Sequence, residues 1–223
     1  MAMAAGSRVA TLVESVPAAD PAPLGLGAFA LTTFVLSGHN ATFIPDLIWV
    51  GLALFYGGLT QLLAGMWEFR NRNVFGATAF STYGGFWMSL GVFVVLAETS
   101  KSFGSALTGA NLPNAVAWFL VAFAIFNTYM LLWSTQVSVA VFLVFATLEA
   151  TEILLAIGNF DAGNGNASNY WIHLGGWVGI ATAACAWYAS AAGVINGMKD
   201  RHVLPVGAPL SRAHTPMLKA HRA

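Results

Sequence analysis

The chain has 223 residues, of which 57% are hydrophobic and only 8% charged, and its formal net charge is zero. An ordinary soluble domain carries about 25% charged residues, so this composition excludes a typical water-exposed surface and indicates a membrane protein in contact with a lipid bilayer. Zero net charge gives no electrostatic reason to bind nucleic acid, and the single cysteine, Cys185, excludes a disulfide framework within one chain.

The distribution of apolar residues divides the chain into three parts. Residues 1–19 are small and mixed, with Arg8 ahead of a weak apolar patch that Glu14 interrupts, so we expect a flexible cytoplasmic lead and no cleavable signal. Residues 20–198 are expected to form a transmembrane domain. Residues 199–223 are expected to form a basic, flexible cytoplasmic tail.

The first predicted helix covers residues 21–36. Pro21 and Pro23 open it, and proline suits the first turn of a helix because the N–H groups of that turn are unpaired in any case. No charge occurs between residues 24 and 37, and Gly-His-Asn at 38–40 fits a helix stop. Because roughly 20 apolar residues are needed to cross a bilayer, we expect neighbouring helices to cover one end of this short helix.

Five further apolar stretches complete an all-α polytopic chain with six transmembrane helices. A very short, uncharged connection at 134–136 makes the fourth and fifth helices antiparallel neighbours. A polar turn at 70–73 and loops at 98–111 and 158–169 separate the other helices. The further predicted helices cover residues 47–69, 74–97, 113–133, 137–157 and 170–198.

The positions of the basic residues predict the orientation. Six spans place both termini on the same side, and cytoplasmic segments of membrane proteins are rich in Lys and Arg. With both termini in the cytoplasm, only Lys101 of the nine Lys and Arg residues lies outside. We therefore expect a multi-pass protein of the plasma (inner) membrane with cytoplasmic termini.

No motif of a soluble enzyme occurs in the sequence. It has no phosphate-binding glycine loop with a lysine, no Glu-x-x-His pair and no nucleophile elbow. The paired carboxylates of the transmembrane domain have no adjacent histidine, so we expect no enzyme, no cofactor and no metal site. Polar side chains are costly inside a bilayer, so they are the first candidates for function.

Two groups of polar residues lie on the first and third helices. Thr32 and Thr33 follow Phe29 by about one turn. Either each hydroxyl bonds to a carbonyl of the preceding turn, or one of them lines a narrow path beside Phe29. Tyr83, preceded by Thr78, lies far from the interfaces where tyrosine is favoured. It is either core filling with a satisfied hydroxyl or a gate that offers a ring and a hydrogen bond.

Two acids lie one turn apart on the fifth helix. Glu149 and Glu152 repel each other at this spacing, so we expect one of them to hold a proton. Either the pair bonds to donors at a helix or subunit contact, or it is a proton-binding site. Leu148, Glu152 and Asn159 share one stripe of the same helix.

Polar residues also occur towards the two membrane faces. Gln61 lies in the second helix, towards the cytoplasm, and is a candidate for a polar position in a path. His39, Asn40 and His173 lie near the outer face, where a protonated histidine would favour the entry of an anion. The alternative interpretation is that these histidines only cap helix ends.

Several motifs resemble the acetate uptake transporter family, which includes bacterial succinate–acetate permeases and yeast acetate permeases. The matching segments occur in the family's order along five of the six predicted helices, and the fourth helix matches poorly. They are Pro-Ala-Pro-Leu-Gly-Leu at 21–26 with Phe29, Thr32 and Thr33, His39-Asn40, Phe-Tyr-Gly-Gly at 55–58 with Gln61, Phe-Gly-x-Thr-Ala-Phe at 75–80 with Tyr83, Leu-Leu-Ala-Ile-Gly-Asn at 154–159, and His-x-x-Gly-Trp at 173–177.

The resemblance implies a hexamer of six-helix subunits, each with its own path for acetate and, in some members, succinate. It also implies a hydrophobic constriction that falls here on Phe29, Tyr83 and Leu148. Family members have been described both as proton symporters and as anion channels. Asp20 replaces the family's opening asparagine, and the acids at 149 and 152 stand at positions that are mostly apolar in relatives.

We therefore predict a membrane protein that passes small monocarboxylates, acetate first. Thr, Tyr, Gln and Asn groups would replace the hydration shell of the carboxylate, and the constriction would exclude larger or hydrated solutes. The alternative is a channel for a small neutral solute, namely undissociated acid, ammonia or water.

Overall fold

The computed structural model describes residues 19–107, 111–166, 168–199 and 201–211. Its elements are α2 (Ala22–Asn40), α3 (Ile48–Leu54), the π-helix η1 (Phe55–Thr60), α4 (Gln61–Arg70), α5 (Val74–Thr99), α6 (Lys101–Ala106), α7 (Asn111–Ser134), α8 (Val139–Gly163) and α9 (Tyr170–Lys199). In this described part, all regular structure is helical and six stretches are long and apolar enough to cross a membrane. The predicted all-α fold with six spans is therefore confirmed.

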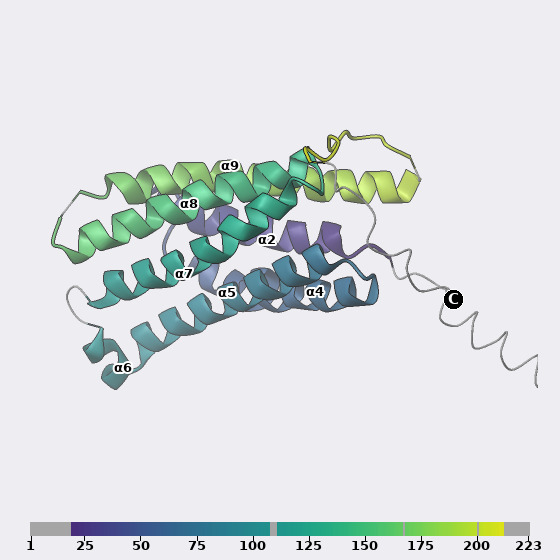
Figure 1. The fold of residues 1–223 in the computed structure, drawn as a ribbon. Helices are drawn as coiled ribbons and strands as arrows, with labels where there is room; N and C mark the ends of the chain where they lie inside the picture. The colour runs from purple at the N-terminus through teal and green to yellow at the C-terminus, as the bar shows by residue number, and fades with distance from the viewer. Residues whose placement is uncertain (1–18, 108–110, 167, 200, 212–223) are drawn as a thin grey trace, which may run out of the picture.

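The long helices lie side by side along a common direction, with α6 at one end of the bundle and residues 201–211 at the other (Figure 1). We call these the α6 end and the tail end. The second span is made of α3, η1 and α4, and the other spans are single helices. Since successive spans alternate in direction, α2, α5 and α8 all run from the tail end to the α6 end.

Several helix boundaries differ from those expected, among them the end of α2, which reaches Asn40 and not residue 36. The short helix α6 lies within the segment 98–111 that was expected to be a loop, and the Ser100 hydroxyl caps it by accepting a hydrogen bond from Phe103 N at 3.4 Å. The helix α8 continues to Gly163, past the expected end at residue 157. A helix needs apolar residues only where it crosses hydrocarbon, so a polar last turn can extend beyond that region.

The second span packs tightly against α2 and α5 through glycines. A Cβ atom on Gly57 of η1 would lie 2.6 Å from Thr32 Oγ1, and a Cβ atom on Gly84 of α5 would lie 2.7 Å from Leu62 N. Because these distances are too short for real Cβ atoms, only glycine allows the helices to come this close.

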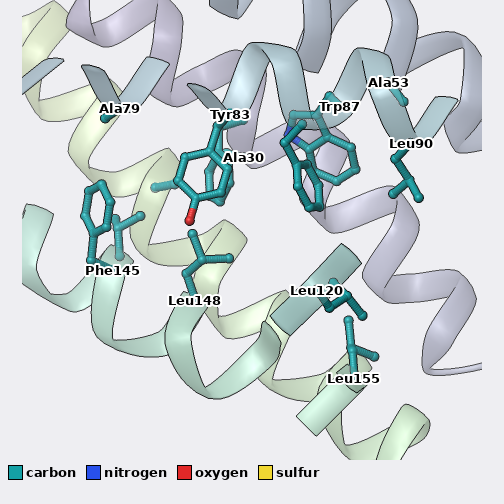
Figure 2. Close-up of a cluster of buried hydrophobic side chains, with 14 of the residues drawn as sticks. Ala30, Ala53, Ala79, Tyr83, Trp87, Leu90, Leu120, Phe145, Leu148 and Leu155 are labelled. Atoms are coloured by element: carbon teal, nitrogen blue, oxygen red, sulfur yellow. The ribbon is translucent and has the colours of Figure 1, made fainter. Parts of the chain in front are cut away.

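The centre of the bundle is aromatic. The Tyr83 ring packs edge-on against Phe29 of α2, Phe126 of α7 and Phe145 of α8, with ring centroids 5.8, 5.5 and 6.5 Å apart. Such edge-to-face contacts are favourable for aromatic rings. Figure 2 shows Tyr83 reaching towards Phe145 and Leu148. Side chains of four spans therefore meet around one tyrosine.

Part of the C-terminal tail lies against the bundle. Val206 O accepts a hydrogen bond from Ala140 N at 2.9 Å, and Leu210 N donates to Thr135 O at 2.7 Å. We expected a flexible tail, but the first turn of α8 has N–H groups without helical partners, and Val206 O, a carbonyl of this segment, satisfies one of them. Residues 1–18 of the expected lead and residues 212–223 of the tail lie outside the described residues.

Gly84 and Gly85 provide a matched pair for testing the packing of α5. The Gly84→Ala variant should lower the free energy of unfolding by about 1–3 kcal/mol, because the added methyl group collides with the backbone of α4. Gly85→Ala should be neutral or slightly stabilising, since a Cβ at that position would meet nothing within 4 Å in the described structure. Thermal unfolding of the two purified variants measures the difference, and equal melting temperatures would contradict this packing.

Candidate functional site

Two cavities inside the bundle meet at three side chains. The larger cavity, about 410 Å³, reaches the α6 end, and the smaller one, about 20 Å³, lies towards the tail end. Phe29, Tyr83 and Leu148 line both cavities, and no other described residue lines both. These three side chains, all buried, therefore separate the cavities, and we call them the constriction.

Three parallel spans supply the constriction, one residue each. Phe29 comes from α2, Tyr83 from α5 and Leu148 from α8. The Phe29 and Tyr83 rings make an edge-to-face contact with an interplanar angle of 64°. The structure thus brings together the three residues at which the family resemblance places a constriction.

The Tyr83 hydroxyl joins the constriction to a buried polar cluster. It lies 2.9 Å from Asn127 Oδ1 of α7 and 3.2 Å from Glu152 Oε1 of α8. A tyrosine hydroxyl has a single proton, so it cannot donate to both oxygens at once. Both contacts are hydrogen bonds only if Glu152 is protonated and donates to the tyrosine oxygen.

The second acid of α8 lies on the other side of Asn127. Asn127 Nδ2 donates to Glu149 Oε2 at 2.6 Å and to Phe145 O at 3.0 Å. Thr128 Oγ1 lies 2.8 Å from Glu149 Oε1. The Tyr83 hydroxyl and Asn127 therefore connect the two acids, which share no direct hydrogen bond in the described structure. Glu152 lines the larger cavity, whereas Glu149 lines neither of the two described cavities.

The α6 end of the larger cavity is polar. His39 Nε2 lies 3.4 Å from Asp46 Oδ1, which also accepts a hydrogen bond from Trp49 Nε1 at 3.2 Å. Asn40 and Glu98 line the same region. Among the described residues that line this cavity, three are acidic and none is lysine or arginine.

The other predicted polar positions separate into two groups. Thr33 and Asn159 line the larger cavity and Gln61 the smaller one. The Asn159 amide donates to Leu155 O at 2.8 Å. Of the remaining described candidates, Thr32, Thr78 and His173 line neither cavity.

The two neighbouring threonines of α2 have different surroundings. The Thr32 hydroxyl donates to Ala28 O of the preceding turn at 3.0 Å. The Thr33 hydroxyl has no hydrogen-bond partner among the described residues. Of the two, only Thr33 can offer its hydroxyl to a solute without losing a bond.

The unusual acid at the start of α2 lies away from the cavities. Asp20 Oδ1 accepts a hydrogen bond from Ala22 N at 2.9 Å. A carboxylate is favourable at the N-terminus of a helix, because it accepts an unpaired N–H and interacts with the helix dipole. Asp20 is therefore accounted for by the start of this helix.

Asn127 is the main residue that the sequence analysis missed. It lies in the middle of the fourth span, which matched the family poorly, and its uncharged amide does not interrupt the apolar pattern. The rule that polar groups inside a membrane are functional candidates would have identified it. In the described part of the chain, no group of three or more His, Cys, Asp or Glu side chains is placed to hold a metal ion.

Comparisons with known proteins agree on one relationship. A family model described as the GPR1/FUN34/yaaH family matches residues 5–209. The chain is 41% identical to acetate permease A of Emericella nidulans, over 95% of this chain and 71% of that protein. It is 35% identical to the succinate-acetate/proton symporter SatP of Escherichia coli K12, over 85% of this chain and 95% of that protein.

A solved structure is also similar. The structure of the bacterial acetate channel SatP superimposes with a TM-score of 0.76 at 35% sequence identity, and the match covers 85% of this chain and 99% of that one.

The Asn127→Ala variant tests the polar cluster. It should lower the free energy of unfolding by about 1–3 kcal/mol, because it removes one hydrogen bond each from the Tyr83 hydroxyl, the Glu149 carboxylate and the Phe145 carbonyl inside the bundle. The exposed Asn166, whose amide also bonds a carboxylate oxygen (Asp161 Oδ2, 2.7 Å), supplies the control substitution to alanine. If both variants unfold at the temperature of the unmodified protein, the cluster does not contribute to stability.

Proposed function

The chain belongs to the GPR1/FUN34/yaaH family, and we propose that it passes acetate and other small carboxylates, succinate among them, across a membrane through a path within each subunit. The observation that carries the proposal is the pair of cavities separated by Phe29, Tyr83 and Leu148. An apolar constriction admits a small solute that has lost its hydration shell and excludes larger or hydrated ones.

Polar groups on both sides of the constriction replace water around the solute. Thr33 and Asn159 lie on the larger side, and Gln61 lies on the smaller side. Each of them offers one or two hydrogen-bonding groups, so binding is weak enough for the solute to leave. At the constriction itself, the Tyr83 ring contacts the methyl end of acetate.

The charges of the larger cavity favour movement of the carboxylate together with a proton. Asp46, Glu98 and Glu152 line this cavity, and the described lining residues include no lysine or arginine to balance them. An unprotonated acetate would be repelled by these acids. Glu152, next to the constriction, is the proposed proton site, and Glu149 supports it through Asn127.

The proposed setting is the plasma (inner) membrane, with the α6 end outside and both termini, including the lead at 1–19 and the tail at 199–223, in the cytoplasm. The basic residues support this orientation, since only Lys101 then lies outside. Asn40, His39 and His173 would then lie at the outer mouth.

We also propose that the subunits associate, as a hexamer. Glu149 is only partly buried in one subunit, and its partner Thr128 is exposed on α7. A carboxylate in the middle of a span is costly next to lipid, so a second copy covering the α7–α8 surface would stabilise it.

A channel for a small neutral solute is the second candidate, because the acids of the larger cavity disfavour any anion. Uptake of radiolabelled acetate by proteoliposomes separates the proposed function from a water or ammonia channel. We expect uptake above the rate of protein-free vesicles, and faster uptake when the outside is more acidic. A water or ammonia channel would leave acetate uptake at the rate of protein-free vesicles.

The Tyr83→Ala variant tests the constriction. Removing the ring should allow larger monocarboxylates to enter proteoliposomes, so the ratio of uptake of a larger acid to that of acetate should rise several-fold. Tyr83→Phe keeps the ring and should keep the selectivity of the unmodified protein. Unchanged selectivity in Tyr83→Ala, and in Leu148→Ala as a second variant, would show that the constriction does not select by size.

A further inference from the structure

A second layer of side chains lies one helical turn beyond the constriction, on the side of the larger cavity. Thr33, Trp87 and Glu152 each follow a constriction residue by four positions, on α2, α5 and α8 respectively. Four residues of α-helix advance by about 6 Å, and the three helices run in the same direction. All three residues line the larger cavity, and none of them lines the smaller one. Figure 2 shows Tyr83 and Trp87 following one another along α5.

Each residue of this second layer has a buried polar atom without a hydrogen-bond partner among the described residues. The atoms are Thr33 Oγ1, Trp87 Nε1 and Glu152 Oε2. The three residues are 5%, 3% and 2% exposed. Buried polar atoms in proteins are nearly always bonded, and each one left unpaired costs about 1–3 kcal/mol. Three such atoms, in residues that line the same cavity, indicate that a polar ligand completes them.

The chemistry of the three atoms defines that ligand. The indole N–H of Trp87 can only donate a hydrogen bond, and the Thr33 hydroxyl is free to donate. Two donors suit the two oxygens of a carboxyl group. The third atom belongs to a carboxyl group, which repels a carboxylate when it is ionised and bonds to it when one proton lies between the two.

The Tyr83 hydroxyl accommodates that proton in either of two positions. When the proton is on Glu152 Oε1, it points to the tyrosine oxygen, and Tyr83 donates to Asn127 Oδ1. When the proton is on Oε2, it points into the cavity, and Tyr83 turns its own proton to Glu152 Oε1. In the first state every proton has an acceptor within the protein, and in the second state the Oε2 proton bonds to a solute in the cavity.

We propose that Thr33, Trp87 and Glu152 form a binding site for the carboxyl group of the solute, on the larger-cavity side of the constriction, and that Glu152 shares its proton with the bound carboxylate. This proposal rests on the proposed function, because it assumes that small carboxylates enter the larger cavity. The alkyl end of the solute then points towards Phe29, Tyr83 and Leu148.

Transfer of the proton is balanced by the groups present. The Glu152 carboxyl and a carboxylate RCOO⁻ become the Glu152 carboxylate and RCOOH, and the neutral acid enters the apolar constriction. A proton from the water at the α6 end restores Glu152. The ionisable groups near Glu152 are Tyr83 of α5 and Glu149 of α8, with Tyr129 of α7 next to Tyr83. His39 of α2 lines the larger cavity towards the α6 end, and Ile172 of α9 also lines this cavity.

Equilibrium binding of radiolabelled acetate to the purified full-length protein tests this site. Thr33→Val keeps the side-chain shape and Trp87→Phe keeps an aromatic ring, and each removes one donor, so each should weaken acetate binding about 5- to 10-fold. The matched controls are Thr32→Val, whose hydroxyl bonds within its own helix, and Trp118→Phe, whose ring is exposed. Both controls should bind acetate like the unmodified protein.

Glu152→Gln separates the role of the proton from that of the hydrogen bonds. Its amide still donates but holds no titratable proton, so acetate affinity should no longer fall as the pH is raised. An infrared band of a protonated carboxylic acid that changes when acetate binds should be present in the unmodified protein and absent from this variant.

The outcomes separate this proposal from the proposed function. If proteoliposomes with the unmodified protein take up acetate while Thr33→Val and Trp87→Phe bind it like their controls, the site is wrong and the function stands. A pH-dependent affinity retained in Glu152→Gln contradicts the shared proton. If the unmodified protein neither binds nor takes up acetate, the function and the site both fail. If the Trp87→Phe variant does not fold, the comparison of Thr33→Val with Thr32→Val tests the site.

Discussion

The Tyr83 side chain takes part in both the apolar and the polar interactions at the centre of the bundle. Its ring packs 5.8 Å from the Phe29 ring and, with Leu148, separates the two cavities. Its hydroxyl lies within hydrogen-bonding distance of both Asn127 and Glu152. A solute that displaces this ring therefore also disturbs the hydrogen bond of the buried acid. Under the proposed function, passage of a solute through the constriction is therefore coupled to the position of one proton.

The common direction of three spans places their side chains in successive layers along the two cavities. Because α2, α5 and α8 are parallel, the residue four positions after each constriction residue lies on the same side of the constriction. The first layer is apolar, and the second layer offers polar atoms that have no hydrogen-bond partner among the described residues. A short-chain carboxylate fits this order of layers, because its carboxyl end is polar and its alkyl end is apolar.

Much of the fold could be predicted from the sequence, because the length and hydropathy of six apolar stretches are local properties. The constriction residues came from the family resemblance, since their spacing along the chain contains no sign that they meet. Thr32 and Thr33 could not be distinguished, because two adjacent helical residues face different directions and only the packing of α2 decides which one meets the cavity. Asn127 was missed because one amide hardly lowers the hydropathy of a span.

We propose that a carboxylate crosses the constriction together with a proton. Simultaneous measurement of electrical current and radiolabelled acetate flux through the reconstituted protein tests this coupling. We expect acetate flux to be accompanied by no net charge, because each carboxylate takes one proton with it. A current of one negative charge for each acetate transported would show that the carboxylate crosses without a proton.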